Sequence, residues 1–112
     1  MTGSPTEVAE AAFRHYRAQD RGAAFALYAG DFTFTSPRDD RIGKDASFAR
    51  CFPTADRFIE QRLLHVTPAD GELAFLHYEY VLTDGARYRN VEAVTVRDGL
   101  GRDVRVFFGG TV

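Results

Sequence analysis

Two ionisable side chains lie inside otherwise apolar stretches and are candidates for acid-base chemistry. Glu92 lies in the run from Tyr88 to Val96, and His77 lies in the run from Leu73 to Leu82. Loss of water around a buried carboxyl group disfavours its charged form, so the pKa of Glu92 is expected to be raised towards neutrality. Histidine titrates in the same range without any perturbation. Together the two residues form a candidate general acid-base pair.

Both residues also have structural explanations. Glu92 is equally consistent with a carboxylate held by Arg105, Arg89 or His77, and His77 with a hydrogen-bonded histidine of the core. Cys51 has no evident base beside it in the sequence, which favours a packed thiol over a nucleophile.

The sequence predicts neither a metal nor a cofactor. The three histidines show no ligand spacing, and His77 with Glu79 supplies two ligands on one strand where a catalytic zinc needs three. No glycine-rich phosphate loop leads from a strand into a helix, so nucleotide cofactors are not expected either.

Length and charge limit the class of protein. The 112 residues fit one domain over residues 1–112, with a frayed tail at residues 1–5. A net charge of -2 gives no basic surface for nucleic acid, and no apolar run is long enough to cross a membrane. The single cysteine and the absence of a secretion signal at the N-terminus lead us to expect a cytoplasmic protein.

Periodicity predicts helices first and strands afterwards. Apolar residues at three- and four-residue steps predict a first helix that is capped by Thr6 and runs to about residue 19. Alternating residues and three Asp-Gly pairs predict an antiparallel meander in the second half. The further expected helices are 23–29 and 44–52, and the expected strands are 32–36, 57–66, 73–82, 88–96 and 104–108. This order is typical of an α+β domain with helices on one face of a sheet.

The turn at Asp84-Gly85 decides which residues share a face of the sheet. A two-residue turn places His77 opposite Glu92, and Glu79 opposite Asn90. One face then carries Leu73, Phe75, His77, Glu79 and Val81 with Tyr88, Asn90, Glu92, Val94 and Val96. The other carries Leu76, Tyr78, Tyr80, Val91 and Ala93 with Arg89, a candidate partner-binding surface. A three-residue turn would shift the register by one and separate His77 from Glu92.

Three segments resemble the nuclear transport factor 2-like superfamily, and more narrowly the SnoaL-like proteins. They are Leu27–Pro37, Val96–Gly99 and Val106–Gly109, taken with the order of the elements. The resemblance implies a cone-shaped domain in which a curved antiparallel sheet wraps three helices and an apolar cavity, and a homodimer formed through the sheet faces. The family includes ketosteroid isomerases, polyketide cyclases, epoxide hydrolases and dehydratases, alongside members without chemistry.

The ketosteroid isomerases within this resemblance suggest roles for single residues. Glu92 falls where that family has an oxyanion-stabilising Asp, Phe108 falls at a pocket aromatic, and Tyr28 matches a tyrosine of the same hydrogen-bonded network. The family's general-base Asp is replaced by Ser36, which argues against steroid isomerisation by the familiar route. Asp39 and Asp40 lie in the loop near the cavity mouth, where either one of them replaces that base or both belong to a solvated loop with Arg38 and Arg41 as ion partners.

Two functional hypotheses follow from the residues. The first is a cofactor-independent enzyme that moves a proton on a small apolar molecule, or adds water to it, with Glu92 and His77 as acid and base. Its substrate-orienting residues are Asn90, Glu79 and Tyr28, and its water-excluding residues are Phe34, Phe75, Val94, Val106 and Phe108. The second is a non-catalytic dimeric module that binds a hydrophobic ligand or another protein.

Overall fold

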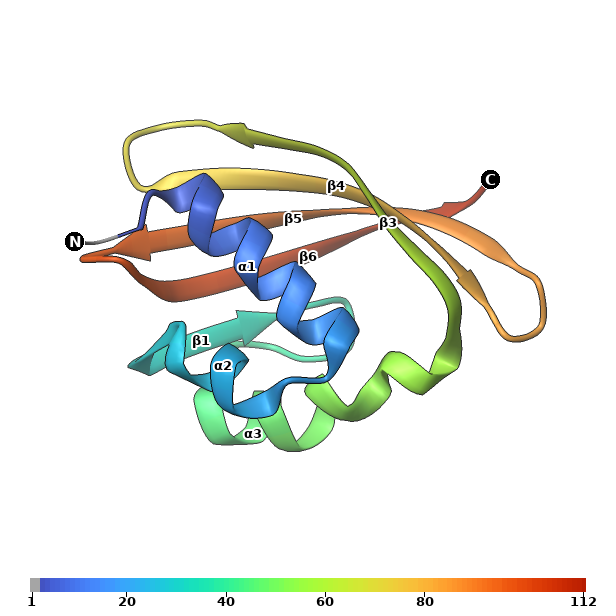
Figure 1. The fold of residues 1–112 in the computed structure, drawn as a ribbon, viewed down its shortest axis with the longest axis horizontal. Coiled ribbons are helices and arrows are strands. Elements are labelled where there is room, and N and C mark those ends of the chain that lie inside the picture. The colour runs from blue at the N-terminus through green and yellow to red at the C-terminus, as the bar shows by residue number, and fades with distance from the viewer. Residues whose placement is uncertain (1–2) are drawn as a thin grey trace.

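The computed structural model describes residues 3–112, which form helices followed by a long meander (Figure 1). The first half contains α1 (Pro5–Ala18), α2 (Arg21–Ala26), β1 (Tyr28–Thr35), β2 (Ile42–Gly43), α3 (Lys44–Arg50) and the 3-10 helix η1 (Phe52–Arg57). The second half contains β3 (Phe58–Pro68), β4 (Leu73–Leu82), β5 (Arg87–Arg97) and β6 (Leu100–Thr111). The expected α+β class is confirmed.

The six strands form one curved sheet in the order β2-β1-β6-β5-β4-β3, with α1 lying across its concave face (Figure 1). The sheet was expected to be antiparallel throughout, but β1 runs parallel to β6. The reason is the route of the chain. After β1 it crosses through α3 and η1 to the far edge, and the antiparallel meander returns to β1 with its last strand pointing the same way.

The first helix begins earlier than the sequence predicted. Ser4, not Thr6, is the N-cap, because its side chain accepts from the Glu7 amide while Glu7 accepts from the Ser4 amide. Pro5 occupies the first turn, where a missing amide hydrogen costs nothing. The expected tail at residues 1–5 is therefore wrong for Ser4 and Pro5, and its residues 1 and 2 lie outside the described range.

The first strand also begins earlier than expected. Asp20 caps the start of α2 by accepting from the Ala23 amide, and α2 ends at Ala26 instead of residue 29 because the chain enters β1 at Tyr28. Gly30 and Asp31, which lie between the expected helix and the expected strand, are part of β1. The third helix ends at Arg50, two residues before the predicted limit, and continues into η1.

Two Asp-Gly pairs form different turns. Asp98 and Gly99 both have positive φ, 55° and 76°, as a two-residue turn between twisted strands requires. Between β4 and β5 only Gly85 has positive φ, at 90°, and the Leu82 amide donates to the Ala86 carbonyl. This connection has three residues, so β4 is shifted by one position against β5 relative to the two-residue prediction.

The core lies between α1 and the centre of the sheet. Val8 and Ala9 of α1 are buried against Leu76, Val94 and Val104. Towards the other end, the sheet curves away from the helices (Figure 1). Among the described residues, no helix is both long enough and apolar enough to span a membrane.

Candidate functional site

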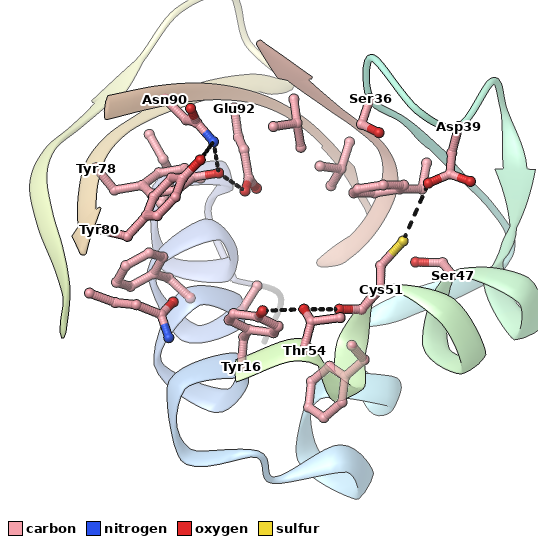
Figure 2. A pocket seen from close by; sticks show the side chains of 18 of the residues that line it. Tyr16, Ser36, Asp39, Ser47, Cys51, Thr54, Tyr78, Tyr80, Asn90 and Glu92 are labelled. Atoms are coloured by element: carbon pink, nitrogen blue, oxygen red, sulfur yellow. Dashed lines mark hydrogen bonds between the residues drawn. The ribbon is translucent and has the colours of Figure 1, made fainter. Parts of the chain in front are cut away.

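A pocket of about 610 Å³ opens between the concave face of the sheet and the helices (Figure 2). Its apolar wall comes from all the layers of the fold, including Phe13 of α1, Phe34 of β1, Phe48 of α3, Val94 of β5 and Val106 of β6. The acidic residues that line it are Asp39 and Glu92. The pocket is therefore largely apolar and is lined by two carboxyl groups.

The polar wall of the pocket is a hydrogen-bonded network on β4 and β5. Tyr78 donates from its hydroxyl to Oε2 of Glu92 at 2.8 Å. Asn90 donates from Nδ2 towards the hydroxyls of Tyr78 and Tyr80, each at 3.4 Å, and its Oδ1 accepts from the Gly109 amide at 3.3 Å. Figure 2 shows the Glu92 carboxyl pointing into the pocket. Within residues 3–112, no side chain or amide donates to Oε1 of Glu92, so this oxygen faces the space that a ligand would fill.

The pKa values of the network depend mainly on burial. Desolvation raises the pKa of Glu92, and the Tyr78 hydrogen bond opposes the shift because it favours the ionised form. Desolvation and the nearby Glu92 charge raise the pKa of Tyr78 and of Tyr28. Both phenols are therefore neutral donors at physiological pH, while Glu92 can take up or release a proton at a higher pH than an exposed carboxyl.

The opposite wall carries a second set of polar groups. The Tyr16 hydroxyl bonds to Thr54, which itself donates to the Cys51 carbonyl at 2.6 Å. The Cys51 thiol lies 3.7 Å from Asp39 Oδ2, and Asp39 also pairs with Arg50 at 2.9 Å. Burial, and then the Asp39 carboxylate, raise the pKa of Cys51 to about 11. The thiol is thus protonated at neutral pH, consistent with the expected packed cysteine.

The two residues of the predicted acid-base pair lie on opposite faces of the sheet. Glu92 lines the pocket, whereas His77 lies on the convex face of the sheet. The other predicted residues that line the pocket are Tyr28, Phe34, Ser36, Asn90, Val94, Val106 and Phe108. Those that do not line it are Phe75, Glu79 and Asp40.

The one-residue shift explains the errors on β4. Leu76, instead of His77, pairs with Glu92, and Tyr78, instead of Glu79, pairs with Asn90. Adjacent residues of a strand face opposite ways, so the whole predicted set on β4 moves to the other face. Phe75 is moved by the same shift. Asp40 is exposed, and it is the preceding residue of the same loop, Asp39, that reaches the pocket.

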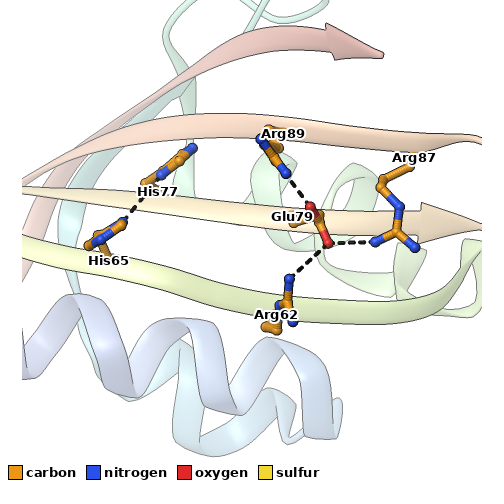
Figure 3. Close-up of polar contacts among 6 residues, drawn as sticks. All are labelled: Arg62, His65, His77, Glu79, Arg87 and Arg89. Carbon is orange, nitrogen blue, oxygen red and sulfur yellow. Dashed lines mark hydrogen bonds and ion pairs between the residues drawn. The ribbon is translucent and has the colours of Figure 1, made fainter. Parts of the chain in front are cut away.

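On the convex face, Glu79 is the centre of an ion cluster (Figure 3). Arg62, Arg87 and Arg89 all bind its carboxylate, at 3.3, 2.5 and 3.0 Å, and the Glu79 side chain is 2% exposed. These contacts, first that of Arg89, lower the pKa of Glu79. His77 stacks on His65, with their Nδ1 atoms 3.5 Å apart.

None of the basic residues proposed to hold Glu92 contacts it. Arg89 binds Glu79, Arg105 binds Asp103 at 3.0 Å, and His77 lies on the other face. The partner of Glu92 is the neutral hydroxyl of Tyr78. The structural explanation in which an ion pair holds Glu92 is therefore wrong.

Tyr78 and Tyr80 are the site residues that the sequence analysis missed. They were assigned to a partner-binding surface beside Arg89, Val91 and Ala93, but they face the pocket while those three residues face the convex side. The available signal was the spacing of Leu76, Tyr78 and Tyr80, which places an apolar and aromatic stripe on one face.

Tyr28 and Ser36 line the pocket, but neither belongs to the hydrogen-bonded network of Glu92. The Tyr28 ring packs on Phe32 and Phe48, and the phenol bonded to the acid is Tyr78 instead. Ser36 accepts from the Arg38 amide at 3.1 Å, so its hydroxyl shapes the loop.

Comparison with known proteins identifies the fold. No protein-family model matches the chain, and no curated protein matches it. An NTF2-like protein of unknown function from Burkholderia xenovorans has a TM-score of 0.76 at 19% identity, over 93% of this chain and 81% of that one. A proposed ketosteroid isomerase from Kribbella flavida has a TM-score of 0.77 at 23% identity, over 100% of this chain and 84% of that one. A computationally designed 17-OHP binder has a TM-score of 0.72 at 22% identity, over 96% of this chain and 93% of that one. The chain therefore has the NTF2-like fold, as its resemblance predicted.

Proposed function

We propose that the pocket binds a small apolar molecule and that Glu92 transfers a proton on it without a cofactor. The observation that carries this proposal is a carboxyl group with one oxygen held by Tyr78 at 2.8 Å and the other facing an apolar pocket of about 610 Å³. Two structural neighbours, a designed 17-OHP binder and a proposed ketosteroid isomerase, support an apolar ligand.

The reaction class that suits this arrangement is movement of a proton next to a carbonyl group. Oε1 of the ionised Glu92 takes a proton from a carbon beside the carbonyl, and the electron pair of that C–H bond moves onto the carbonyl oxygen as an enolate. In a β,γ-unsaturated ketone the enolate is conjugated with the neighbouring double bond, so the same carboxyl returns the proton to the γ-carbon while the carbonyl re-forms and the double bond moves, which completes an isomerisation with no oxidant or reductant. The Tyr28 hydroxyl is the proposed donor to the enolate oxygen, because it is neutral and has no partner within residues 3–112.

Raised basicity and exclusion of water make Glu92 suited to this role. An exposed carboxylate is a weak base at neutral pH, and burial raises the pKa of Glu92 towards the range where a general base works best. Asn90 is 5% exposed and directs its Nδ2 towards the hydroxyls of both Tyr78 and Tyr80 at 3.4 Å. Asn90 thus acts as a positioning residue, while Tyr78 and Glu92 face the ligand.

Non-catalytic binding in the same pocket is the second candidate. It is favoured by Ser36, which occupies the position of the base that the ketosteroid isomerases use. It is also favoured by the Tyr78 hydrogen bond, because a carboxyl that is satisfied by a hydroxyl can be purely structural.

We also propose that the chain forms a homodimer through the convex face of the sheet. On that face Phe107 of β6 is 54% exposed and Phe75 of β4 is 36% exposed. Val91 and Ala93 lie between them, on β5. Large exposed aromatics on a sheet face are typical of contact surfaces. Light scattering at micromolar concentration should give twice the monomer mass, and a monomer mass would contradict this proposal.

Deuterium exchange tests proton transfer without knowledge of the natural substrate. A panel of bicyclic to tetracyclic ketones is incubated with the protein in D₂O, and incorporation beside the carbonyl is followed by NMR. We expect Glu92→Gln to slow the exchange about 10²–10⁴-fold. The matched control is His77→Gln, which changes a titratable residue on the other face and should leave the rate unchanged. Ketones that raise the melting temperature but show no enzyme-dependent exchange would support the non-catalytic candidate instead.

A further inference from the structure

The mouth of the pocket carries more positive than negative charge. Three exposed arginines line the pocket, Arg38, Arg50 and Arg57, whereas Asp39 is the carboxylate beside them. Asp39 is already bound by Arg50 at 2.9 Å. The guanidinium groups of Arg38 and Arg57 are therefore not neutralised by Asp39.

Arg38 and Arg57 reach the mouth from different elements. Arg38 belongs to the loop between β1 and β2, and Arg57 is the last residue of η1. In the described part of the chain, neither has a carboxylate within ion-pair distance, although Asp40 and Asp56 are exposed nearby in the sequence. Arginine that is free at the edge of an apolar pocket is well suited to a carboxylate or sulfonate, because its fork of donors matches two oxygen atoms.

The electrostatic effect of both arginines extends to hydroxyls inside the pocket. Burial raises the pKa of Tyr80, and the positive charge of Arg38 opposes that shift. Burial likewise raises the pKa of Tyr16, and Arg57 is among the groups that oppose it. Tyr80 lies on β4 and Tyr16 on α1, so the two charges act on opposite walls of the same pocket.

We propose that the ligand of this pocket is an apolar acid, whose anionic group binds Arg38 and Arg57 at the mouth while its apolar body fills the interior. The inference rests on the proposed function, because it requires that the pocket take an apolar molecule. It adds the charge and the orientation of that molecule. The end of the ligand opposite the anion then lies towards Glu92 and Tyr78, away from the solvent.

Two fluorescent probes with the same rings separate the two proposals. 8-Anilinonaphthalene-1-sulfonate carries a sulfonate, N-phenyl-1-naphthylamine lacks it, and both become fluorescent in apolar surroundings. We expect the sulfonate to bind at least about tenfold more tightly, with Arg38→Gln and Arg57→Gln each weakening it about three- to tenfold. Both variants should leave the affinity for the neutral probe within about twofold.

Arg14→Gln is the matched control. It removes the same charge from an exposed position on α1 that does not line the pocket, and it should change neither affinity. Added salt should weaken the sulfonate probe alone, because an exposed ion contact is screened.

The outcomes distinguish the two proposals. Equal affinities for the two probes, or an advantage of the sulfonate that survives the double variant Arg38→Gln/Arg57→Gln, would overturn the acid inference and leave the apolar pocket standing. If neither probe binds, the proposed function and the inference both fall.

Discussion

Removing a single hydroxyl tests the network around Glu92. In Tyr78→Phe the ring remains in place, since it packs on Phe13 with centroids 5.4 Å apart, and only the donor to Glu92 is lost. The hydrogen bond from Asn90 to that hydroxyl is lost with it, but at 3.4 Å it is long and therefore weak.

The expected loss of stability follows from the type of bond. A hydrogen bond to a charged group contributes about 1.5–3 kcal/mol, and Glu92 is partly exposed to the pocket, so the lower end applies, about 1.5 kcal/mol. At about 4 °C per kcal/mol for a chain of this size, the melting temperature should fall by about 6 °C at neutral pH.

The loss should depend on pH in a defined direction. The Tyr78 hydroxyl favours the ionised form of Glu92, so its removal raises the pKa of folded Glu92 further. Below the pKa of the unfolded chain, Glu92 is protonated in every state and the difference disappears. The stability gap between wild type and variant therefore opens as the pH rises through the folded pKa, and it is greatest where wild-type Glu92 is ionised.

Thermal unfolding from about pH 4 to pH 8 measures this gap, with Tyr80→Phe as the control. Tyr80→Phe also removes one hydroxyl from this wall of the pocket, but the partner of that hydroxyl is the neutral side chain of Asn90 at 3.4 Å. The control should cost about 0.5 kcal/mol or less, at every pH. Equal losses in the two variants, or a Tyr78→Phe loss that does not change with pH, would refute the role given to this bond.

Two further variants test the placement of residues. His77→Ala should leave the affinity for the neutral naphthylamine probe unchanged, since His77 is on the convex face; weaker binding, measured by fluorescence titration, would contradict the register of β4. Gly101→Ala places a methyl group 2.6 Å from Cδ1 of the Tyr28 ring, so we expect a loss of about 1–3 kcal/mol in chemical denaturation and altered probe binding. Gly22→Ala, with open space around it in α2, should instead stabilise by about 0.5–1 kcal/mol.

The sequence was sufficient for the β5–β6 half of the pocket. Asp98-Gly99 forms a two-residue turn, and a register shift between Thr95 and Val96 then places Val94 opposite Val104 and Glu92 opposite Val106. The apolar alternation of Val104, Val106 and Phe108 along β6 was the signal that placed these residues on the face of Glu92. Long strands with strong alternation are the part of a fold that local patterns specify best.

The β4 half could not be predicted from its turn because Asp-Gly is compatible with more than one hairpin. In Asp98-Gly99 both residues have positive φ, whereas in the other pair only Gly85 does. The same dipeptide thus forms a two-residue turn in one place and part of a three-residue turn in the other. A difference of one residue in the turn exchanges every side chain between the two faces.

The distribution of charge distinguishes the two possible registers of β4 against β5, whereas the sequence of the turn does not. In the two-residue register, Glu79 and His77 would share the apolar pocket with Glu92, and Glu79 would leave Arg62, Arg87 and Arg89 without their common carboxylate. In the observed register those three arginines surround Glu79 on the convex face, and Tyr78 takes its place beside Asn90 and supplies the neutral donor for Glu92. A pocket wall with one carboxyl bound to a hydroxyl is less costly than one that also buries Glu79 away from its three arginines, because buried charges without adequate partners are strongly destabilising. Distribution of charge across the sheet therefore favours the register that makes Glu92 the acid of this wall.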